Sequence, residues 1–495
     1  MRRAERIAIL YGQMQMKYLL QLGLMILLVG IFGCGNPPGT PPSDPGPGPN
    51  PSPMASYVNK GASFFGTNEG FNRFYTDSSW VATRTLYISR TGSNSNAATN
   101  SEQNPAPVSA IPGLVEPGDK VIFLQSTIPY TNVNIHLEPE KSGSYDAPVV
   151  FVAERDAGGG YGVHLECNFG TGNADSSCFN FEGSNYMAVE GFEMSGGRYG
   201  VRAVGLDYTS TQHQQGIAVL NNKIHDQDKD PIFTGQSDWS VIEGNEAYNS
   251  GSGDGHGIYI SNGSDWGIVR RNELYQNASS DLQINADPAS SCQDVGVLYV
   301  DPACDGSADN GQGQGVSEYF VVVDNFLHHG IGQGPNFTSV RNSRIANNIF
   351  GPYERHNTSF WQETDNPNLG SSGNIIEDNL FVGKKSHLLQ LVVYATGNTV
   401  RNNIFLALNA NGTAASSSVN SLEIDGLSDA TFVGNMYIGG YLDGHIVQSN
   451  EDSRDDYDPA WFTNNSFGRV HHPEDWTPSS TSPYGNFKGW EPPAF

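Results

Sequence analysis

The segment VDNFL at residues 323–327 returns 23 residues later as ANNIF at residues 346–350. Both segments are short and apolar, with an asparagine at the same place. Equivalent segments recur along the chain, with the asparagine at Asn222, Asn245, Asn272, Asn325, Asn348, Asn379, Asn403, Asn435 and Asn465. Several steps are 23, 24 or 27 residues long, and the longer ones are interpreted as turns that carry loop insertions. A repeat of this size, built from short β-branched strands, predicts a parallel β-solenoid.

The recurring asparagine has a physical reason. A solenoid must turn a corner at the same place in every turn. Asparagine adopts left-handed backbone at low cost, and its amide can hydrogen-bond to the turns on either side. We therefore expect a ladder of asparagines along one corner, with Gly191 at the equivalent position of the turn NYMAVEGFEM, residues 185–194.

This pattern resembles the right-handed parallel β-helix of the pectate-lyase-like superfamily from residue 85 onward. The segments LYISRTGSNSNAATNSEQNPAP (86–107), VEPGDKVIF (115–123) and SYDAPVVFVAE (144–154) are similar to the opening turns of secreted β-helix enzymes. The resemblance implies an all-β, single-stranded, right-handed parallel β-helix, which we place at residues 55–470. A C-terminal cap is expected at residues 471–495. These segments are shared by enzymes of several reaction types, so they do not select a reaction.

The start of the chain predicts export. Lys17 precedes a 16-residue apolar run, Tyr18–Gly33, which is shorter than the roughly 20 residues of a membrane span and typical of a secretory signal. We expect residues 1–33 to be a signal peptide, with translation starting at Met14 or Met16. Ile31–Cys34 resembles a bacterial lipobox, which implies lipidation of Cys34. The Pro/Gly-rich residues 34–54 then form an extended linker.

The charge excludes one class of partner. The chain has 52 acidic and 26 basic residues, a net charge of −26, and nucleic-acid binding needs a basic face. An acidic polysaccharide would need a local basic surface or bound Ca²⁺. We expect a monomer, exported to the cell envelope or secreted, that contacts a membrane only through its lipid anchor.

Cysteine spacing predicts two disulfides. Five cysteines minus Cys34 leave two close pairs, Cys167 with Cys178 and Cys292 with Cys304. In an exported protein an even set of cysteines indicates disulfides, and neither pair has the CxxC spacing of a metal site.

A second strand of each turn is expected to carry the chemistry. Strand alternation directs Ile258, Ile260, Leu282 and Ile284 inward and leaves Tyr259 and Gln283 outward. Equivalent outward residues on neighbouring turns lie about 4.8 Å apart, close enough to contact one sugar chain. The predicted substrate-binding residues are Arg198, Lys229, Tyr259, Gln283 and Trp361.

The predicted catalytic residues are Asp254, His256 and Asp281. Asp281 follows His256 by 25 residues, one turn, so we expect the two side chains to be neighbours. A histidine flanked by carboxylates suits a general base or acid. The arrangement resembles the Asp-x-His and next-turn Asp of alginate C5-epimerases. It departs from them at Gly255, where the family has proline, and at Gly251, where the family has its catalytic tyrosine.

The acidic turn 226–230 is a candidate metal site. Asp226, Asp228 and Asp230 could bind Ca²⁺, although the segment lacks the glycine and the last acidic residue of an EF-hand. A solvated turn is the alternative interpretation.

The sequence therefore predicts an exported carbohydrate-active protein, a lyase or C5-epimerase acting on an extracellular polyuronate. Two alternatives stay open. A glycoside hydrolase would use Asp254 and Asp281 as its carboxylate pair. A non-catalytic surface protein would only bind glycan. No Ser-His-Asp order in the sequence indicates a hydrolytic triad.

Overall fold

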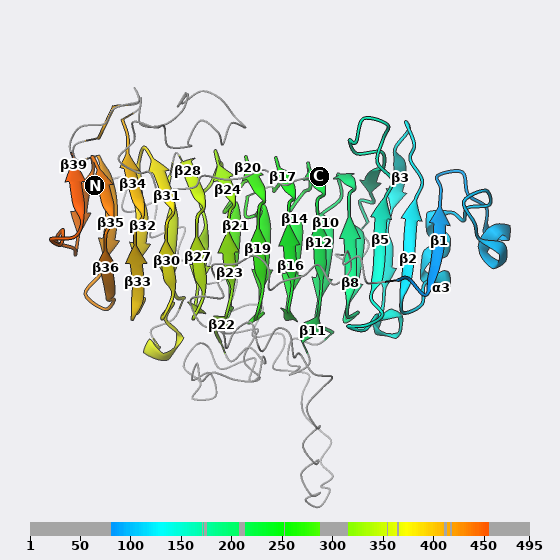
Figure 1. Cartoon of the computed structure of the whole chain (residues 1–495), viewed down its shortest axis with the longest axis horizontal. Helices are drawn as coiled ribbons and strands as arrows, with labels where there is room; N and C mark the ends of the chain where they lie inside the picture. The colour runs from blue at the N-terminus through cyan, green and yellow to red at the C-terminus, as the bar shows by residue number, and fades with distance from the viewer. Residues whose placement is uncertain are drawn as a thin grey trace, which may run out of the picture. The chain divides into compact units, whose positions relative to one another are not determined.

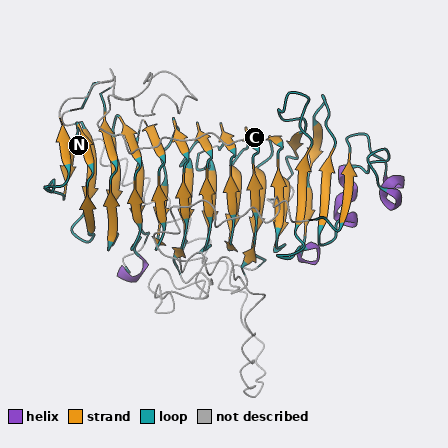
Figure 2. Ribbon diagram, viewed as in Figure 1, coloured by secondary structure: helices purple, strands orange, loops and turns teal. Residues whose placement is uncertain are grey.

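The computed structural model describes residues 81–170, 172, 176–206, 213–251, 253–287, 315–353, 355–363, 366–409, 413–415 and 418–454. All of them belong to one compact unit of the chain, Ser52–Phe495. Strands dominate these residues, and helix is confined to α3 (Ile111–Leu114) and short 3₁₀ turns (Figure 2). Among the described residues there is no helix long and apolar enough to cross a membrane.

Three long parallel sheets run along this unit, and from β2 to β38 the successive turns of the chain add strands to all three (Figure 1). Sheet 1 consists of β1 (Arg84–Ile88), β2 (Asp119–Phe123), β5 (Val149–Ala153), β8 (Met187–Glu190), β12 (Ala218–Leu220), β16 (Val241–Glu243), β19 (Ile268–Arg270), β23 (Val321–Val323), β27 (Arg344–Ala346), β30 (Ile375–Glu377), β33 (Asn398–Arg401) and β36 (Ala430–Val433).

Sheet 2 follows the asparagine corner. It consists of β3 (Tyr130–Val133), β6 (His164–Cys167), β9 (Glu193–Ser195), β13 (Lys223–His225), β17 (Glu246–Tyr248), β20 (Glu273–Tyr275), β24 (Phe326–His328), β28 (Ile349–Tyr353), β31 (Leu380–Gly383), β34 (Ile404–Ala407), β37 (Met436–Ile438) and β39 (Asp452–Arg454).

Sheet 3 carries the strands on which the sequence places the chemistry. It consists of β4 (Ile135–Leu137), β7 (Ser177–Glu182), β10 (Tyr199–Val204), β14 (Asp230–Gly235), β18 (Ile258–Ser261), β21 (Leu282–Asn285), β25 (Asn336–Thr338), β29 (Thr358–Trp361), β32 (Ser386–Leu391), β35 (Val419–Ile424) and β38 (Tyr441–Asp443). Two short pairs, β11 (Gln214–Gln215) with β15 (Ser237–Asp238) and β22 (Ser317–Glu318) with β26 (Val340–Arg341), extend the loops. The parallel β-solenoid predicted from the repeat and the right-handed parallel β-helix implied by the resemblance are confirmed.

The asparagine ladder forms as expected. The backbone N–H and the side-chain amide of Asn325 both donate to Oδ1 of Asn348, 2.9 Å away, and Asn348 makes the same pair of bonds to Asn379. The amide of Asn348 also donates to the backbone oxygen of Val322. The ladder asparagines from Asn222 to Asn435 are buried and hydrogen-bonded from turn to turn, whereas the last predicted member, Asn465, lies outside the described residues.

Two details of the corner differ from the sequence prediction. The left-handed residue is the one before the ladder asparagine: Asp324 has φ 57° and Asn347 has φ 54°. Gly191, with φ 86°, belongs to this left-handed row, and Phe192 occupies the ladder position because its N–H donates to Oδ1 of Asn222. The asparagine side chain is therefore selected for its hydrogen bonds, and its neighbour makes the bend.

Inside the helix, side chains of successive turns stack on one another. The rings of Phe381 and Phe405 lie 4.9 Å apart and nearly parallel, and Tyr437 continues the stack at 5.1 Å. Ile258, Ile260, Leu282 and Ile284 all face this core, as predicted. The core fixes which side of sheet 3 faces away from it, and that side carries the candidate site.

Candidate functional site

The outward side of sheet 3 carries one continuous ladder of side chains. Strand register places them at equivalent positions on consecutive strands from β10 to β35: Arg202, Phe233, Tyr259, Gln283, Asn336, Ser359, Gln390 and Glu423. We call this row the outward ladder. The prediction that Tyr259 and Gln283 are equivalent is confirmed by their pairing.

Neighbouring side chains of the outward ladder hydrogen-bond to one another and to Trp361. Oε1 of Gln283 accepts from the amide of Asn336 at 2.9 Å, and Nε1 of Trp361 donates to Oδ1 of Asn336 at 2.7 Å. Gln283 and Asn336 are consequently almost fully covered, whereas Trp361 is half-buried. Of the predicted substrate-binding residues, Trp361 and Tyr259 therefore offer more surface than Gln283 does.

His256 lies just before β18, in contact with an aromatic ring and under the electrostatic influence of Lys229 and Asp254. Its ring centre is 4.8 Å from that of Tyr259. Its Nδ1 accepts a hydrogen bond from the backbone N–H of Ser280 at 3.2 Å. Burial, with Lys229 nearby, lowers the pKa of His256 to about 4. The imidazole is thus neutral at pH 7, and because Nδ1 accepts, the ring proton is on Nε2.

Asp254 and Lys229 form the charged pair. Nζ of Lys229 lies 4.0 Å from Oδ2 of Asp254, whose side chain is 83% exposed. The Lys229 side chain is 27% exposed. Asp254 was predicted to orient His256, but the contact that the structure gives its carboxylate is with Lys229.

Asp281 does not flank His256 as the sequence predicted. Its carboxylate accepts from the amide of Asn277 at 2.9 Å and from the hydroxyl of Tyr353 at 2.8 Å. The reason is register: Ile258 pairs with Leu282, so the step between these strands is 24 residues and Ser280 is the neighbour of His256. A one-residue difference in register moves a side chain to the other side of a strand. Burial raises the pKa of Asp281 to about 8.

Asp230 is the buried acid that the sequence assigned to a metal. One oxygen accepts from the backbone N–H of His256 at 2.6 Å, and the other has no hydrogen-bond partner among the described residues. Burial raises the pKa of Asp230 to about 7, against the opposing effect of that hydrogen bond and of Lys229. Asp230 therefore accepts a hydrogen bond from the backbone of His256, and its carboxyl group titrates near neutral pH.

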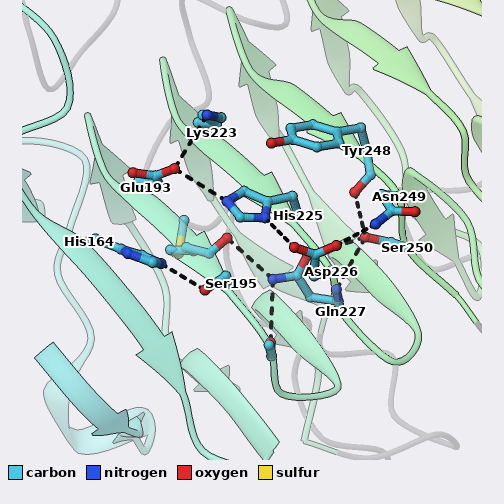
Figure 3. A network of polar contacts seen from close by, with 12 residues as sticks. His164, Glu193, Ser195, Lys223, His225, Asp226, Gln227, Tyr248, Asn249 and Ser250 are labelled. Carbon is cyan, nitrogen blue, oxygen red and sulfur yellow. Dashed lines mark hydrogen bonds and ion pairs between the residues drawn. The ribbon is translucent and has the colours of Figure 1, made fainter. Parts of the chain in front are cut away.

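Asp226 belongs to a different network, on the outward side of sheet 2 (Figure 3). It accepts from Nδ1 of His225 at 2.7 Å and from the amide of Asn249. Nε2 of His225 lies 3.3 Å from Glu193, which also pairs with Lys223 at 3.3 Å. These contacts lower the pKa of Glu193 to about 2, with the bond from His225 as the largest cause.

The predicted metal ligands are thus not gathered into one site. Asp226 is bound within the sheet 2 network, Asp228 is exposed and Asp230 is buried against His256. Asp226 itself is left-handed, with φ 61°, and the chain turns there, so strand alternation does not apply across the segment. Among the described residues no group of three His, Cys, Asp or Glu side chains could hold a metal ion. Calcium binding stays a prediction without an assigned ligand set.

Arg198 is a second basic residue and lies one turn of the β-helix before Lys229. Its guanidinium carbon lies 5.7 Å from the ring centre of Tyr199, and its buried Nε has no hydrogen-bond partner among the described residues. The backbone N–H of Lys229 donates to the oxygen of Arg198, so the two residues occupy equivalent positions on adjacent turns. Two of the predicted substrate-binding residues thus place basic side chains at one edge of sheet 3.

One of the predicted disulfides is present. Cys167 and Cys178 are bonded, with an S–S distance of 2.09 Å. Cys292, Cys304 and the predicted lipidation site Cys34 lie outside the described residues, as do the predicted domain ends at residues 55 and 470 and the predicted cap at residues 471–495.

No protein-family model and no curated protein matches this sequence. Solved structures of similar fold include a pectate lyase, Pel9A, at 14% identity and a TM-score of 0.48, covering 82% of this chain and 91% of that one. The periplasmic alginate epimerase AlgG has 11% identity and a TM-score of 0.40, covering 68% and 75%. The A-module of the Azotobacter vinelandii mannuronan C-5 epimerase AlgE6 has 14% identity and a TM-score of 0.42, covering 71% and 95%. At such identities the similarity concerns the fold.

Proposed function

We propose that this protein is an exported, lipid-anchored enzyme that acts on an acidic polysaccharide as a lyase or a C5-epimerase. The observation that carries the proposal is the cluster at the start of β14 and β18. There a neutral imidazole that bears its proton on Nε2 lies beside the Tyr259 ring and under the electrostatic influence of the Lys229–Asp254 pair. Both reactions begin by removing the proton next to a uronate carboxylate, and both must stabilise the charge that this carboxylate gains.

The cluster supplies the groups for that step. Arg198 and Lys229 offset the carboxylate charge, which the net charge of −26 would otherwise repel. The Nε2–H of His256 donates to the carboxylate oxygen as its charge grows, because a neutral imidazole that accepts at Nδ1 is a donor at Nε2. This role differs from the general base predicted from the sequence.

Proton transfer is assigned to the two neighbours of His256. The exposed carboxylate of Asp254 can take the proton from C5. Burial raises the pKa of Tyr259 to about 12, so its phenol stays protonated and can return a proton to the sugar or to the departing O4 oxygen. Loss of O4 gives a lyase, and return of the proton to the opposite face gives an epimerase.

Two other functions make different predictions. A glycoside hydrolase needs two carboxyl groups facing one glycosidic bond. Asp281, the predicted second carboxyl, is instead engaged by Asn277 and Tyr353. A non-catalytic glycan-binding protein would use the outward ladder alone.

The test is turnover of a panel of polyuronates and neutral glycans by the purified full chain, with Ca²⁺ or with chelator. Ultraviolet absorbance detects unsaturated uronate, a reducing-end assay detects chain cleavage by either elimination or hydrolysis, and NMR of the polymer detects inversion at C5. Unsaturated ends or inverted C5 centres support the proposal. New reducing ends without unsaturation indicate a hydrolase, and retention without any product indicates a binding protein.

Two substitutions of His256 separate its possible roles. The side-chain amide of glutamine can place an N–H near the position of Nε2, and that of asparagine reaches only to the region of Nδ1. His256→Gln should keep a larger share of the activity than His256→Asn if Nε2 is a hydrogen-bond donor, with about a 10²-fold loss of kcat for Asn. Equal losses in both variants would contradict the donor role.

A further inference from the structure

A second group of reactive side chains lies further along the outward ladder, on β29, β32 and β35. Oγ of Ser359 is 3.1 Å from Nε2 of His387. Nδ1 of the same imidazole is 3.3 Å from Oε2 of Glu423. A hydroxyl, an imidazole and a carboxylate thus form one chain of contacts, with the hydroxyl at Nε2 and the carboxylate at Nδ1. This is the order of contacts that activates a serine nucleophile.

Strand register brings the three residues together. Ser359, Gln390 and Glu423 are equivalent positions on adjacent strands, so Ser359 and Glu423 lie about 10 Å apart across two strand spacings. His387, three residues before Gln390, bridges that distance on one side. Gln390 bridges it on the other side: its Oε1 is a second acceptor for the Ser359 hydroxyl proton, 3.2 Å from Oγ, and its Nε2 donates to Oε2 of Glu423 at 3.0 Å. Gln390 therefore fixes the carboxylate that faces the imidazole.

Two further contacts surround His387. Its Nδ1 lies 3.4 Å from Nδ1 of His356 and 3.4 Å from Oγ of Ser386, and the two imidazole rings stack with centres 4.5 Å apart. Burial, together with His356, lowers the pKa of His387 to about 3. The imidazole is therefore unprotonated at neutral pH, as a base must be before it receives a proton.

The solvent exposure of Ser359, His387 and Glu423 agrees with a nucleophile, a base and a carboxylate partner. His387 and the core side of its strand are buried, whereas Ser359 is half-buried and the Glu423 side chain is 34% exposed. The hydroxyl and the carboxylate are thus partly accessible, and the base is shielded from water. The half-buried indole of Trp361, two residues after Ser359 on the same side of the strand, offers an apolar surface beside the hydroxyl.

We propose that Ser359, His387 and Glu423 form a hydrolytic triad that removes ester-linked acyl groups. Oγ of Ser359 bonds to the acyl carbon while its proton passes to Nε2 of His387. The ester bond to the alcohol oxygen then breaks, and that oxygen takes the proton from Nε2. Water hydrolyses the acyl-serine by the same proton route, which releases a carboxylic acid and restores the serine. Glu423 offsets the charge of the imidazolium in both halves.

The position of the triad points to an acylated polysaccharide as the substrate. Ser359 and Tyr259 occupy equivalent ladder positions three strands apart, a separation of about 14 Å. One extended sugar chain can therefore lie across both sites. This assignment of the polymer rests on the proposed function, whereas the triad itself does not.

The first experiment is covalent labelling of the full chain with a fluorophosphonate probe, followed by peptide mass mapping, together with hydrolysis of p-nitrophenyl acetate. We expect the label on Ser359, and its loss together with at least a 10²-fold loss of hydrolysis in Ser359→Ala. Ser126→Ala is the matched control, because the Ser126 hydroxyl donates to Ile128 in an exposed loop, and it should change neither readout. Absence of label on Ser359, or unchanged hydrolysis in Ser359→Ala, overturns the triad.

The roles within the triad need their own variants. His387→Gln should abolish labelling, and Glu423→Gln should slow it by about 10-fold or more while thermal unfolding of both variants stays cooperative. Labelling of Ser359 at the wild-type rate in His387→Gln would overturn the role of the imidazole.

The second experiment measures acetate release from an O-acetylated polyuronate. Release that is lost in Ser359→Ala and kept in the control Ser126→Ala supports an acylated polymer as substrate, and no release from any acylated polymer overturns that assignment. If the wild type releases acetate but forms no unsaturated or inverted product from any polyuronate, the triad stands and the proposed lyase or epimerase function fails.

Discussion

At the scale of single residues, burial sets the charge of His256 and one backbone contact selects its tautomer. The Ser280 N–H occupies Nδ1, and burial lowers the pKa to about 4. We expect the ¹⁵N NMR signals of this ring to show a protonated Nε2 and a bare Nδ1 from pH 8 down to about pH 5. A ring that takes up its second proton near pH 6.5, as a solvent-exposed histidine does, would contradict the placement.

Asp281 makes a second residue-scale prediction, on stability. Its folded pKa is about 8, above the value of about 3.9 in an unfolded chain. A carboxyl whose pKa is raised on folding favours the folded state when protonated, so this stabilisation is full below about pH 4 and is lost as the pH rises towards 8. Asp281→Asn keeps a neutral group between Asn277 and Tyr353 and should flatten that loss.

Chemical denaturation at pH 4, 6 and 8 checks the Asp281 prediction. The variant should gain stability relative to the wild type with each step upward in pH. A difference between the two proteins that stays constant over this range would show that Asp281 does not titrate there.

At the scale of elements, the asparagine corner is a stack of shared hydrogen bonds. Asn348 accepts from both the backbone and the side chain of Asn325. Asn348→Ala would leave the buried backbone N–H of Asn325 unpaired and would remove the bond from Asn348 to Val322, whereas the Asn325 amide keeps its backbone acceptors. An unpaired buried group costs about 1–3 kcal/mol. We expect a loss of at least about 2 kcal/mol in the free energy of unfolding, measured with urea. Asn347→Ala is an unsuitable control because Asn347 is left-handed, so Ser372→Ala, in an inter-strand turn, serves instead.

How far the sequence predicts this molecule also depends on the element. The period of the asparagines and the alternation around Ile258 come from local chemistry, and both are confirmed. The side on which Asp281 lies depends on the register between β18 and β21. That register cannot be read from the sequence, because the loop between two strands has no fixed length. The Ser359, His387 and Glu423 set spans three turns of unequal length, so no local motif marks it. Strand pairing alone reveals it.

At the scale of the whole molecule, charge opposes the proposed substrate. A net charge of −26 repels a polyanion at long range, while Arg198 and Lys229 attract a uronate carboxylate at contact. Salt screens the first effect more than the second, because the Debye length falls to about 10 Å at 0.1 M. The KM for a polyuronate should therefore decrease as salt rises from about 20 to 150 mM, the reverse of a basic enzyme acting on a polyanion.

Lys229→Gln should raise KM at every salt concentration and keep the same downward trend, because the long-range repulsion is unchanged. A wild-type KM that rises with salt would contradict this prediction, because it would mean that long-range attraction brings the polymer to the protein. Arg198 and Lys229 alone could not explain such an attraction.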